Sequence, residues 1–129
     1  MDELSALLSQ RILLFDGSYG VLLQGKKLTE DDFRGERFKE HHKDVHNNPD
    51  LLNITRPEIV RETHDAYLAA GSDIIETNTF TATTISQADY DLDAQVVWEM
   101  NVEGARIAKE AATAFRALDN RPQIGRAHV

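Results

Sequence analysis

Two patterns of hydrophobic and polar residues run along the chain, one typical of buried strands and one typical of helices. Residues 11–15 (RILLF) form a compact apolar run that ends at Asp16 and Gly17, which predicts a buried parallel strand followed by a turn. Residues 73–77 (DIIET) form a second short run, rich in β-branched side chains, directly after a glycine and a serine. We therefore expect two strands, each followed by a polar segment.

Helical spacing dominates two longer stretches. Thr55 and Glu58 match a capping box, which predicts the start of a helix. Gly71 predicts its end. The predicted inner face of this helix comprises Ile59, Thr63, Ala66, Tyr67 and Ala70. A second helix is expected from about Asp93, and its narrow stripe of mostly small residues predicts close packing against a sheet. The stripe comprises Val97, Asn101, Gly104, Ala108, Ala111, Phe115 and Leu118.

The remainder of the chain is less regular. Residues 2–10 predict a short helix, and residues 19–24 predict another that Gly25 ends. Residues 26–50 are polar and predict a long loop, with a helical turn around residues 30–33. The alternation of strands and helices indicates an α/β fold with a parallel sheet, and two strands are too few to complete such a sheet.

Charge and composition exclude several classes of function. The 129 residues carry 22 acidic and 14 basic side chains, a net charge of −8, which argues against a nucleic-acid partner or an anionic membrane surface. No apolar stretch approaches the roughly 20 residues of a membrane span, so we expect a soluble, cytoplasmic protein. Because cysteine is absent, these residues offer no disulfide, thiolate nucleophile or thiolate metal ligand.

Polar side chains follow both predicted strands, at the ends where α/β folds bind ligands. Asp16 and Gly17 open the first segment. The second segment offers a carboxylate, two hydroxyls and an amide, from Glu76, Thr77, Asn78 and Thr79. Spacing alone favours an ordinary strand-to-helix turn for the first segment, because aspartate caps such turns and glycine tolerates positive φ. For the second segment, spacing leaves binding and structural roles equally open.

The histidines do not form a recognisable metal motif. His42 and His46 stand at i, i+4, and His41 precedes them, but their surroundings are rich in Lys and Asn and contain no H-E-x-x-H pattern. This favours a solvated loop surface. His64 lies on or beside the buried edge of the helix after Thr55, where a packed, hydrogen-bonded histidine is expected. We assign no catalytic residue and no metal ligand.

Several long strings carry a resemblance to a known family. They lie at residues 11–24 (RILLFDGSYGVLLQ), 31–38 (DDFRGERF), 47–90 and 97–112, and the strings DFRGERF and ETNTF are of low degeneracy. They resemble the homocysteine S-methyltransferase family, and within it the homocysteine-binding domain that opens cobalamin-dependent methionine synthases. The resemblance covers most of residues 11–118.

The resemblance implies a fold and an activity. The chain would be the N-terminal part of a (β/α)8 TIM barrel, incomplete and inactive alone. In this family, three cysteines from later strands hold a zinc ion that activates the homocysteine thiolate. The thiolate attacks methylcobalamin and gives methionine. Methyltetrahydrofolate then recharges the cobalamin with a methyl group. The resemblance also implies that Asp16 and Gly17 hold the amino-acid end of homocysteine. It places Glu76, Thr77, Asn78 and Thr79 at the same barrel mouth. This fragment is expected to bind neither zinc nor cobalamin itself.

The chain departs from the family pattern at two places. Ser18 and Tyr19 stand where the family usually has Gly or Ala and then Met, so no family role is carried over to them. Residues 123–129 (QIGRAHV) do not continue the family pattern, and residues 124–129 can be encoded by a common sequencing-library adapter read in frame. We expect residues 1–122 to be the N-terminal portion of the homocysteine-binding domain and residues 123–129 to be a non-native tail.

Two other functions stay open at this point. One is a different homocysteine S-methyltransferase with another methyl donor, which the absence of folate- and cobalamin-binding modules from the full-length gene would favour. The other is a non-catalytic small α/β domain that binds an amino acid. Two strands cannot make a parallel sheet covered on both faces, which argues against such a free-standing domain.

Overall fold

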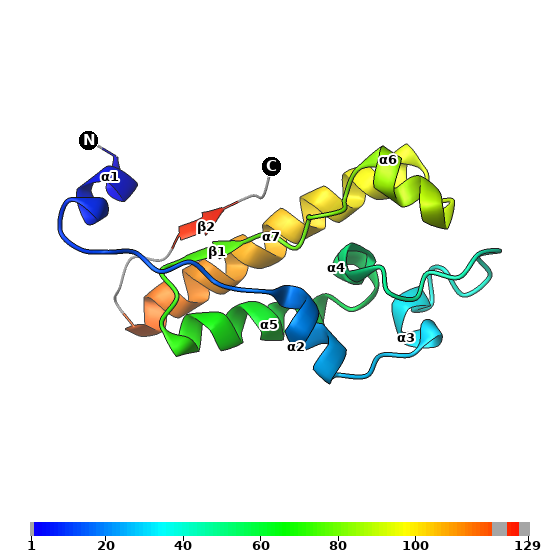
Figure 1. The fold of residues 1–129 in the computed structure, drawn as a ribbon, viewed down its shortest axis with the longest axis horizontal. Helices are drawn as coiled ribbons and strands as arrows, with labels where there is room; N and C mark the ends of the chain where they lie inside the picture. The colour runs from blue at the N-terminus through cyan, green and yellow to red at the C-terminus, as the bar shows by residue number, and fades with distance from the viewer. Residues whose placement is uncertain (1, 120–123, 127–129) are drawn as a thin grey trace.

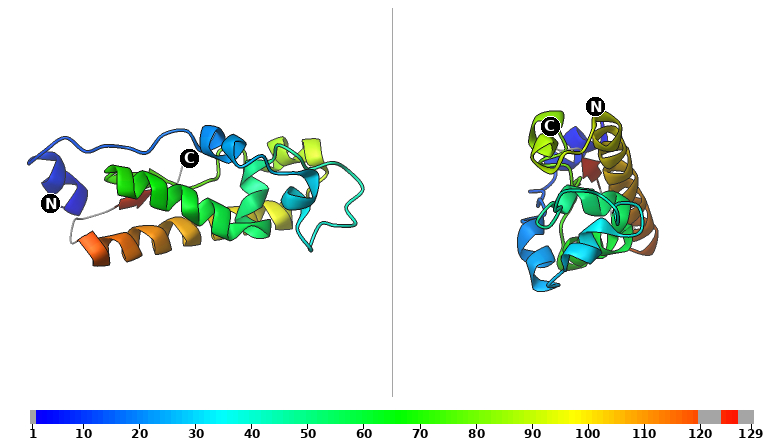
Figure 2. Two further views of the ribbon diagram at one scale, coloured as in Figure 1. Left: turned by 90° about the horizontal axis from the view of Figure 1, so that it is seen from below. Right: turned by 90° about the vertical axis from the view of Figure 1, so that its right-hand side faces the viewer.

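The computed structural model describes residues 2–119 and 124–126, and these residues are mostly helical. The chain runs through α1 (Glu3–Leu8), α2 (Tyr19–Gly25), α3 (Glu30–Arg34), η1 (Pro49–Leu51), α4 (Leu52–Thr55), α5 (Pro57–Ala70), β1 (Ile74–Glu76), α6 (Thr84–Gln87), η2 (Ala88–Tyr90), α7 (Ala94–Asp119) and β2 (Ile124–Arg126). Figure 1 shows α5 and α7 side by side with β1 and β2 above them, and Figure 2 shows α1 at one end of the molecule. No helix in the described part is long and apolar enough to cross a membrane.

The two strands pair in parallel, with Ile74 opposite Ile124, and α7 connects them. This β–α–β arrangement has the parallel pairing expected of an α/β fold, and the described residues form no barrel. The strand β2 falls within residues 123–129. Whether that segment is native stays a prediction, and residues 120–123 and 127–129 lie outside the described part.

The predicted strand at residues 11–15 is present only as a single bridge between Phe15 and Ile74. Its expected burial is wrong, because Ile12 is 85% exposed and Leu14 and Phe15 are more than half exposed. The side chain of Asp73 takes part in holding this segment: its Oδ2 accepts a hydrogen bond from Leu14 N–H at 3.0 Å. The apolar run is therefore paired along one edge and uncovered elsewhere, since the described residues supply no layer over it.

Helix α5 begins and ends where its sequence predicts, but for a different reason at its start. Pro57 occupies the first turn and Gly71 ends the helix at φ 112°, in the left-handed region that favours glycine. The predicted capping box is wrong, because no side chain caps α5. Thr55 instead belongs to α4, and its hydroxyl donates to Leu51 O at 3.3 Å. The extra helical turn of α4 removes Thr55 from the capping position.

The buried face of α5 is rotated around the helix axis by about one residue from the predicted face. Val60, Thr63, His64 and Leu68 are buried, whereas Ala66 and Ala70 are exposed. This face follows from the packing of α5 between α7 on one side and α2 and α4 on the other. The change matters for function, because it turns His64 fully into the interior.

Helix α7 starts as predicted, with Asp93 Oδ1 accepting a hydrogen bond from Val96 N–H at 3.0 Å. Much of the small-residue stripe is buried, including Gly104, Ala108 and Ala111, while Leu118 at the end is 88% exposed. Gly104 allows a close approach: a Cβ there would lie 2.7 Å from Asn53 Nδ2 and 2.8 Å from Thr79 Cγ2. The stripe thus lets the segment after β1 and α4 lie directly on α7.

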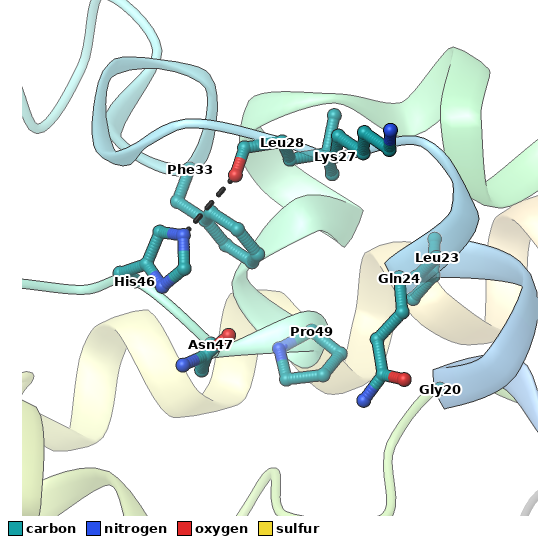
Figure 3. Close-up of a pocket in the computed structure, with 9 residues that line it drawn as sticks. All are labelled: Gly20, Leu23, Gln24, Lys27, Leu28, Phe33, His46, Asn47 and Pro49. Carbon is teal, nitrogen blue, oxygen red and sulfur yellow. Dashed lines mark hydrogen bonds between the residues drawn. The ribbon is translucent and has the colours of Figure 1, made fainter.

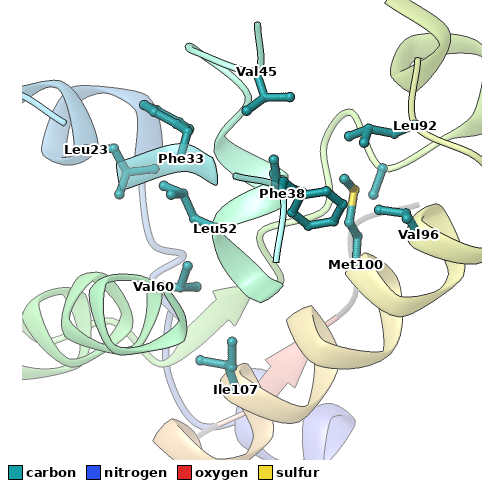
Figure 4. Close-up of a cluster of buried hydrophobic side chains, with 12 residues drawn as sticks. Leu23, Phe33, Phe38, Val45, Leu52, Val60, Leu92, Val96, Met100 and Ile107 are labelled. Carbon is teal, nitrogen blue, oxygen red and sulfur yellow. The ribbon is translucent and has the colours of Figure 1, made fainter. Parts of the chain in front are cut away.

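Two groups of buried side chains form the core. The larger, drawn in Figure 4, joins α2, α3 and α4 to α5 and α7. It comprises Leu23, Phe33, Phe38, Val45, Leu51, Leu52, Val60, Ala82, Leu92, Val96, Met100 and Ile107. The smaller group lies where α5, β1 and α7 meet, and comprises Leu68, Ile75, Ala108, Ala111 and Ala112. The predicted loop at 26–50 therefore contributes core residues, and its expected helical turn is confirmed as α3.

Candidate functional site

The ends of the two predicted strands meet through the side chain of Asp16. Asp16 N–H donates to Ile74 O at 2.9 Å and Ile74 N–H donates to Leu14 O at 3.0 Å, and these two hydrogen bonds form the parallel bridge between Phe15 and Ile74. Asp16 Oδ2 then accepts from Glu76 N–H at 2.9 Å. A carboxylate thus takes the place of a backbone acceptor at the point where regular pairing stops. Asp16 and Glu76, which lie in separate polar segments of the sequence, are direct neighbours here.

Tyr19 closes a hydrogen-bond network around this carboxylate. Its hydroxyl lies 2.8 Å from Asp16 Oδ2, 2.9 Å from Glu76 O and 2.5 Å from His64 Nδ1. The Tyr19 and His64 rings also meet edge to face, with centroids 5.1 Å apart. The expectation of a packed, hydrogen-bonded His64 is confirmed, since this side chain is 0% exposed. Its participation in a network with Asp16 had no signal in the sequence pattern.

Burial sets the protonation of these three groups. Loss of hydration raises the pKa of Asp16, while hydrogen bonds from Glu76 N–H and Tyr19 oppose that rise. Burial, and then the nearby Asp16 carboxylate, raises the pKa of Tyr19, so the phenol keeps its proton. Burial lowers the pKa of His64 from 6.5 to about 4. At neutral pH the network therefore contains a neutral imidazole and a protonated phenol beside Asp16.

Gly17 packs closely against Tyr67 in this turn. A Cβ at Gly17 would lie 3.0 Å from the hydroxyl oxygen of Tyr67. That hydroxyl donates to Ser18 O at 2.8 Å, which ties α5 to the turn. The glycine therefore lets an aromatic side chain of α5 support the turn from behind.

The residues after β1 are largely engaged with the protein itself. Asn78 Nδ2 donates to Pro49 O at 2.9 Å and to Asn53 Oδ1 at 3.1 Å. The hydroxyls of Thr77 and Thr79 lie 2.7 Å apart, and both residues are buried. These contacts anchor the strand end on η1, α4 and α7, which is a structural use of the amide and hydroxyl groups.

A cavity of about 370 Å³ opens between the two strand ends. Of the residues predicted to bind substrate, four line it, namely Gly17, Glu76, Thr77 and Asn78. Asp16 and Thr79 are not among its lining residues. Asp50, which the sequence did not single out, also lines the cavity, and its Oδ2 accepts from Thr81 N–H at 2.6 Å and from the Thr81 hydroxyl at 3.1 Å. The cavity thus carries negative charge from two different segments.

A second cavity, of about 380 Å³, adjoins the first along Gly20 and Pro49. Figure 3 shows it between α2 and the segment before η1, with the His46 ring facing Phe33. The ring centroids of His46 and Phe33 lie 5.2 Å apart, and His46 Nε2 lies 3.1 Å from Leu28 O. These contacts hold the loop in place, and the wall includes a single charged side chain, Lys27.

The described residues offer no group of three or more histidine, cysteine, aspartate or glutamate side chains placed to hold a metal ion. His41 Nε2 lies 2.7 Å from Tyr90 O, and exposed His42 Nε2 lies 2.9 Å from Asp91 Oδ2. Because the chain has no cysteine, its residues do not fit the zinc site that the family resemblance implies.

Comparison with known proteins identifies the family of the chain. The family model for homocysteine S-methyltransferase matches residues 13–126. The structure is similar to the homocysteine methyltransferase MmuM from Escherichia coli in its metallated form, with a TM-score of 0.74 and 21% identity over 98% of this chain and 40% of that chain. For the oxidized form the TM-score is 0.72, with 23% identity over 96% and 38%. The chain spans about two fifths of the length of these structures, and the likeness extends to their fold.

Proposed function

The chain belongs to the homocysteine S-methyltransferase family, and we propose that it is the N-terminal portion of an enzyme that transfers a methyl group to homocysteine. We further place that enzyme in the cobalamin-dependent methionine synthase branch, acting in the cytoplasm in methionine biosynthesis. The strings DFRGERF and ETNTF support this branch. Methylcobalamin would supply the methyl group and methyltetrahydrofolate would recharge it.

The observation that carries the proposal is the junction of Asp16 with Glu76 at the edge of the 370 Å³ cavity. Homocysteine presents an ammonium group and a carboxylate, so its site needs an anion beside backbone N–H groups. Asp16 supplies a carboxylate at the strand junction, Glu76 lines the cavity, and the turn at Gly17 and Ser18 brings backbone close to the same space. The role proposed for these residues is to hold the amino-acid end of homocysteine.

The thiol end needs a separate group, because a thiol requires activation to act as a nucleophile at neutral pH. Zinc would supply that activation when bound by the whole enzyme. Its ligands are not among the residues of this chain, which contains no cysteine. We therefore propose that the chain alone binds neither zinc nor cobalamin and catalyses no methyl transfer.

The test is an assay of the full-length gene product with homocysteine and alternative methyl donors. Methionine formation that depends on cobalamin and methyltetrahydrofolate is the expected result. Methionine formation from a methylsulfonium donor without cobalamin would reject the methionine synthase branch and keep the family activity. Homocysteine binding without turnover by any donor would instead favour a binding protein.

The role of Asp16 is tested in the same full-length protein with Asp16→Asn. A hydrogen bond to a charged group is worth roughly 1.5–3 kcal/mol, so we expect homocysteine affinity to fall by about one to two powers of ten while the fold is kept. The measurements are homocysteine affinity and melting temperature of the same variant. Unchanged affinity with a lowered melting temperature would assign Asp16 to turn formation alone.

A further inference from the structure

The two oxygens of the Asp16 carboxylate differ in their hydrogen-bond partners. Oδ2 accepts two hydrogen bonds, from Glu76 N–H at 2.9 Å and from the Tyr19 hydroxyl at 2.8 Å. Within the described residues, no other residue donates a hydrogen bond to Asp16 Oδ1. A carboxylate that is held through one oxygen has a defined orientation, and its other oxygen is an acceptor that a cationic ligand can use.

The hydroxyl of Tyr19 has one hydrogen and three polar neighbours. This limits which of these groups can donate and which can accept a hydrogen bond. Glu76 O and an ionised Asp16 are acceptors only, so the Tyr19 hydroxyl must donate its hydrogen towards them. The third neighbour, His64 Nδ1, is then best placed as a donor to the Tyr19 oxygen. With the opposite tautomer, His64 Nε2–H would be a buried donor, and Nε2 has no partner in the described part of the chain. The order is therefore His64 N–H to Tyr19 O–H to Asp16.

This order fixes both strand ends at the cavity. The backbone N–H of Glu76 is bound by Asp16, and its carbonyl oxygen lies 2.9 Å from the Tyr19 hydroxyl. Regular pairing ends two residues before Glu76, at the hydrogen bond from Asp16 N–H to Ile74 O. Beyond that point, side chains rather than a β-ladder hold the two segments together. The Tyr19 side chain contacts both segments and, through His64, helix α5.

We infer that Tyr19, oriented by His64, is a positioning residue that holds the Asp16 carboxylate so that its Oδ1 meets the ammonium group of an α-amino acid. The inference rests on the proposed function, since it takes the ligand to be homocysteine. Tyr19 acts through Asp16 and touches no reacting atom. Its contribution therefore belongs to substrate affinity and depends on the carboxylate being present.

A double-mutant cycle in the full-length protein tests this role. Tyr19→Phe keeps the ring and removes only the hydroxyl, so we expect homocysteine affinity to fall about tenfold with Asp16 present. In the Asp16→Asn background the same change should alter affinity by about twofold or less, because the group on which Tyr19 acts has lost its charge. The control is Tyr90→Phe, which removes a hydroxyl that donates to Asn47 O at 3.2 Å and should leave affinity unchanged.

The outcomes separate this inference from the proposed function. An equal loss of affinity in both backgrounds would assign Tyr19 a general structural role and overturn the inference. Unchanged affinity in Tyr19→Phe would overturn it as well. A wild-type protein that binds no homocysteine would reject the proposed function, and the inference with it.

His64 gives an independent measurement if Tyr19→Phe does not fold. His64→Asn places an amide donor near the position of Nδ1, whereas His64→Leu fills the space without a donor. We expect the Asn variant to keep homocysteine affinity within about threefold of wild type and the Leu variant to lose about tenfold. Equal affinity in two folded variants would remove His64 from the network's function.

Discussion

Replacing Gly104 with alanine tests the close packing of α7 against Asn53 and Thr79. The added Cβ would lie 2.7 Å from Asn53 Nδ2 and 2.8 Å from Thr79 Cγ2, both shorter than a Cβ contact tolerates. Asn53 Nδ2 cannot move freely, because it donates to Asn78 O at 2.7 Å and to Met100 O at 3.0 Å. The substitution must therefore displace a buried amide or shift α7.

The magnitudes decide the sign. Alanine gains about 1 kcal/mol over glycine inside a helix. Overpacking costs about 1–3 kcal/mol, and leaving the buried Asn53 amide without partners costs about 1–3 kcal/mol more. We expect Gly104→Ala to lower the free energy of unfolding by about 1–5 kcal/mol, since the steric and hydrogen-bond costs exceed the gain in helix propensity.

The assay is urea unfolding of the 129-residue chain, followed by the far-ultraviolet circular dichroism of its helices. Gly25→Ala is the matched control, because no atom lies within 4 Å of a Cβ at Gly25 and the residue ends α2. It should be neutral or stabilising by up to about 1 kcal/mol. A Gly104→Ala chain as stable as the Gly25→Ala chain would refute the packing argument.

Three further predictions concern pH, metal and solubility. The folded state binds the proton of His64 less tightly than the unfolded chain does, because its pKa is lowered from 6.5 to about 4. The resulting contribution to the free energy of unfolding is complete above pH 6.5 and falls by up to about 3 kcal/mol towards pH 4. It should be missing when the free energy of unfolding of His64→Asn is measured against pH. The same pH dependence in both proteins would contradict it. The purified chain should retain no stoichiometric zinc after dialysis, since it has no cysteine; one tightly held zinc per chain by metal analysis would disprove this. Ile12→Lys should raise solubility with a change in stability of less than about 0.5 kcal/mol, because Ile12 is 85% exposed; unfolding and light scattering measure both, and unchanged aggregation would argue against Ile12 as a cause.

Those parts of the fold that depend on local pattern could be predicted from the sequence. The stop at Gly71, the start of α7 after Asp93 and the turn in α3 follow from residues close together in the chain. The capping box at Thr55 does not form, because Thr55 is part of the neighbouring helix α4 and its hydroxyl donates to Leu51 O. Local signals identify elements well when no neighbouring element competes for the same residue.

The proximity of Asp16 and Glu76 can be predicted from the sequence, whereas the hydrogen bonds that Tyr19 and His64 add around them cannot. Asp16 and Glu76 were singled out because each follows an apolar run, and parallel strand ends gather at one edge. The contact of Tyr19 with His64 joins residues 45 positions apart and depends on which face α5 turns inward. That face is one residue away from the predicted face, because packing against α2, α4 and α7 sets the rotation. Helical periodicity alone does not resolve such a rotation.

The hydrogen bonds that hold the first apolar segment bear on the order in which the chain folds. Leu14 N–H reaches the side chain of Asp73 across 59 positions of sequence, and Glu76 N–H reaches Asp16 across 60. By contrast, α5, Gly71 and β1 are contiguous and close only short loops. Because long loops cost more entropy to close and slow folding, we expect residues 11–16 to dock after this helix–turn–strand unit forms. During synthesis they leave the ribosome before α5 and β1 do, so we expect their apolar side chains to stay open to chaperones and to neighbouring chains until those partners have formed.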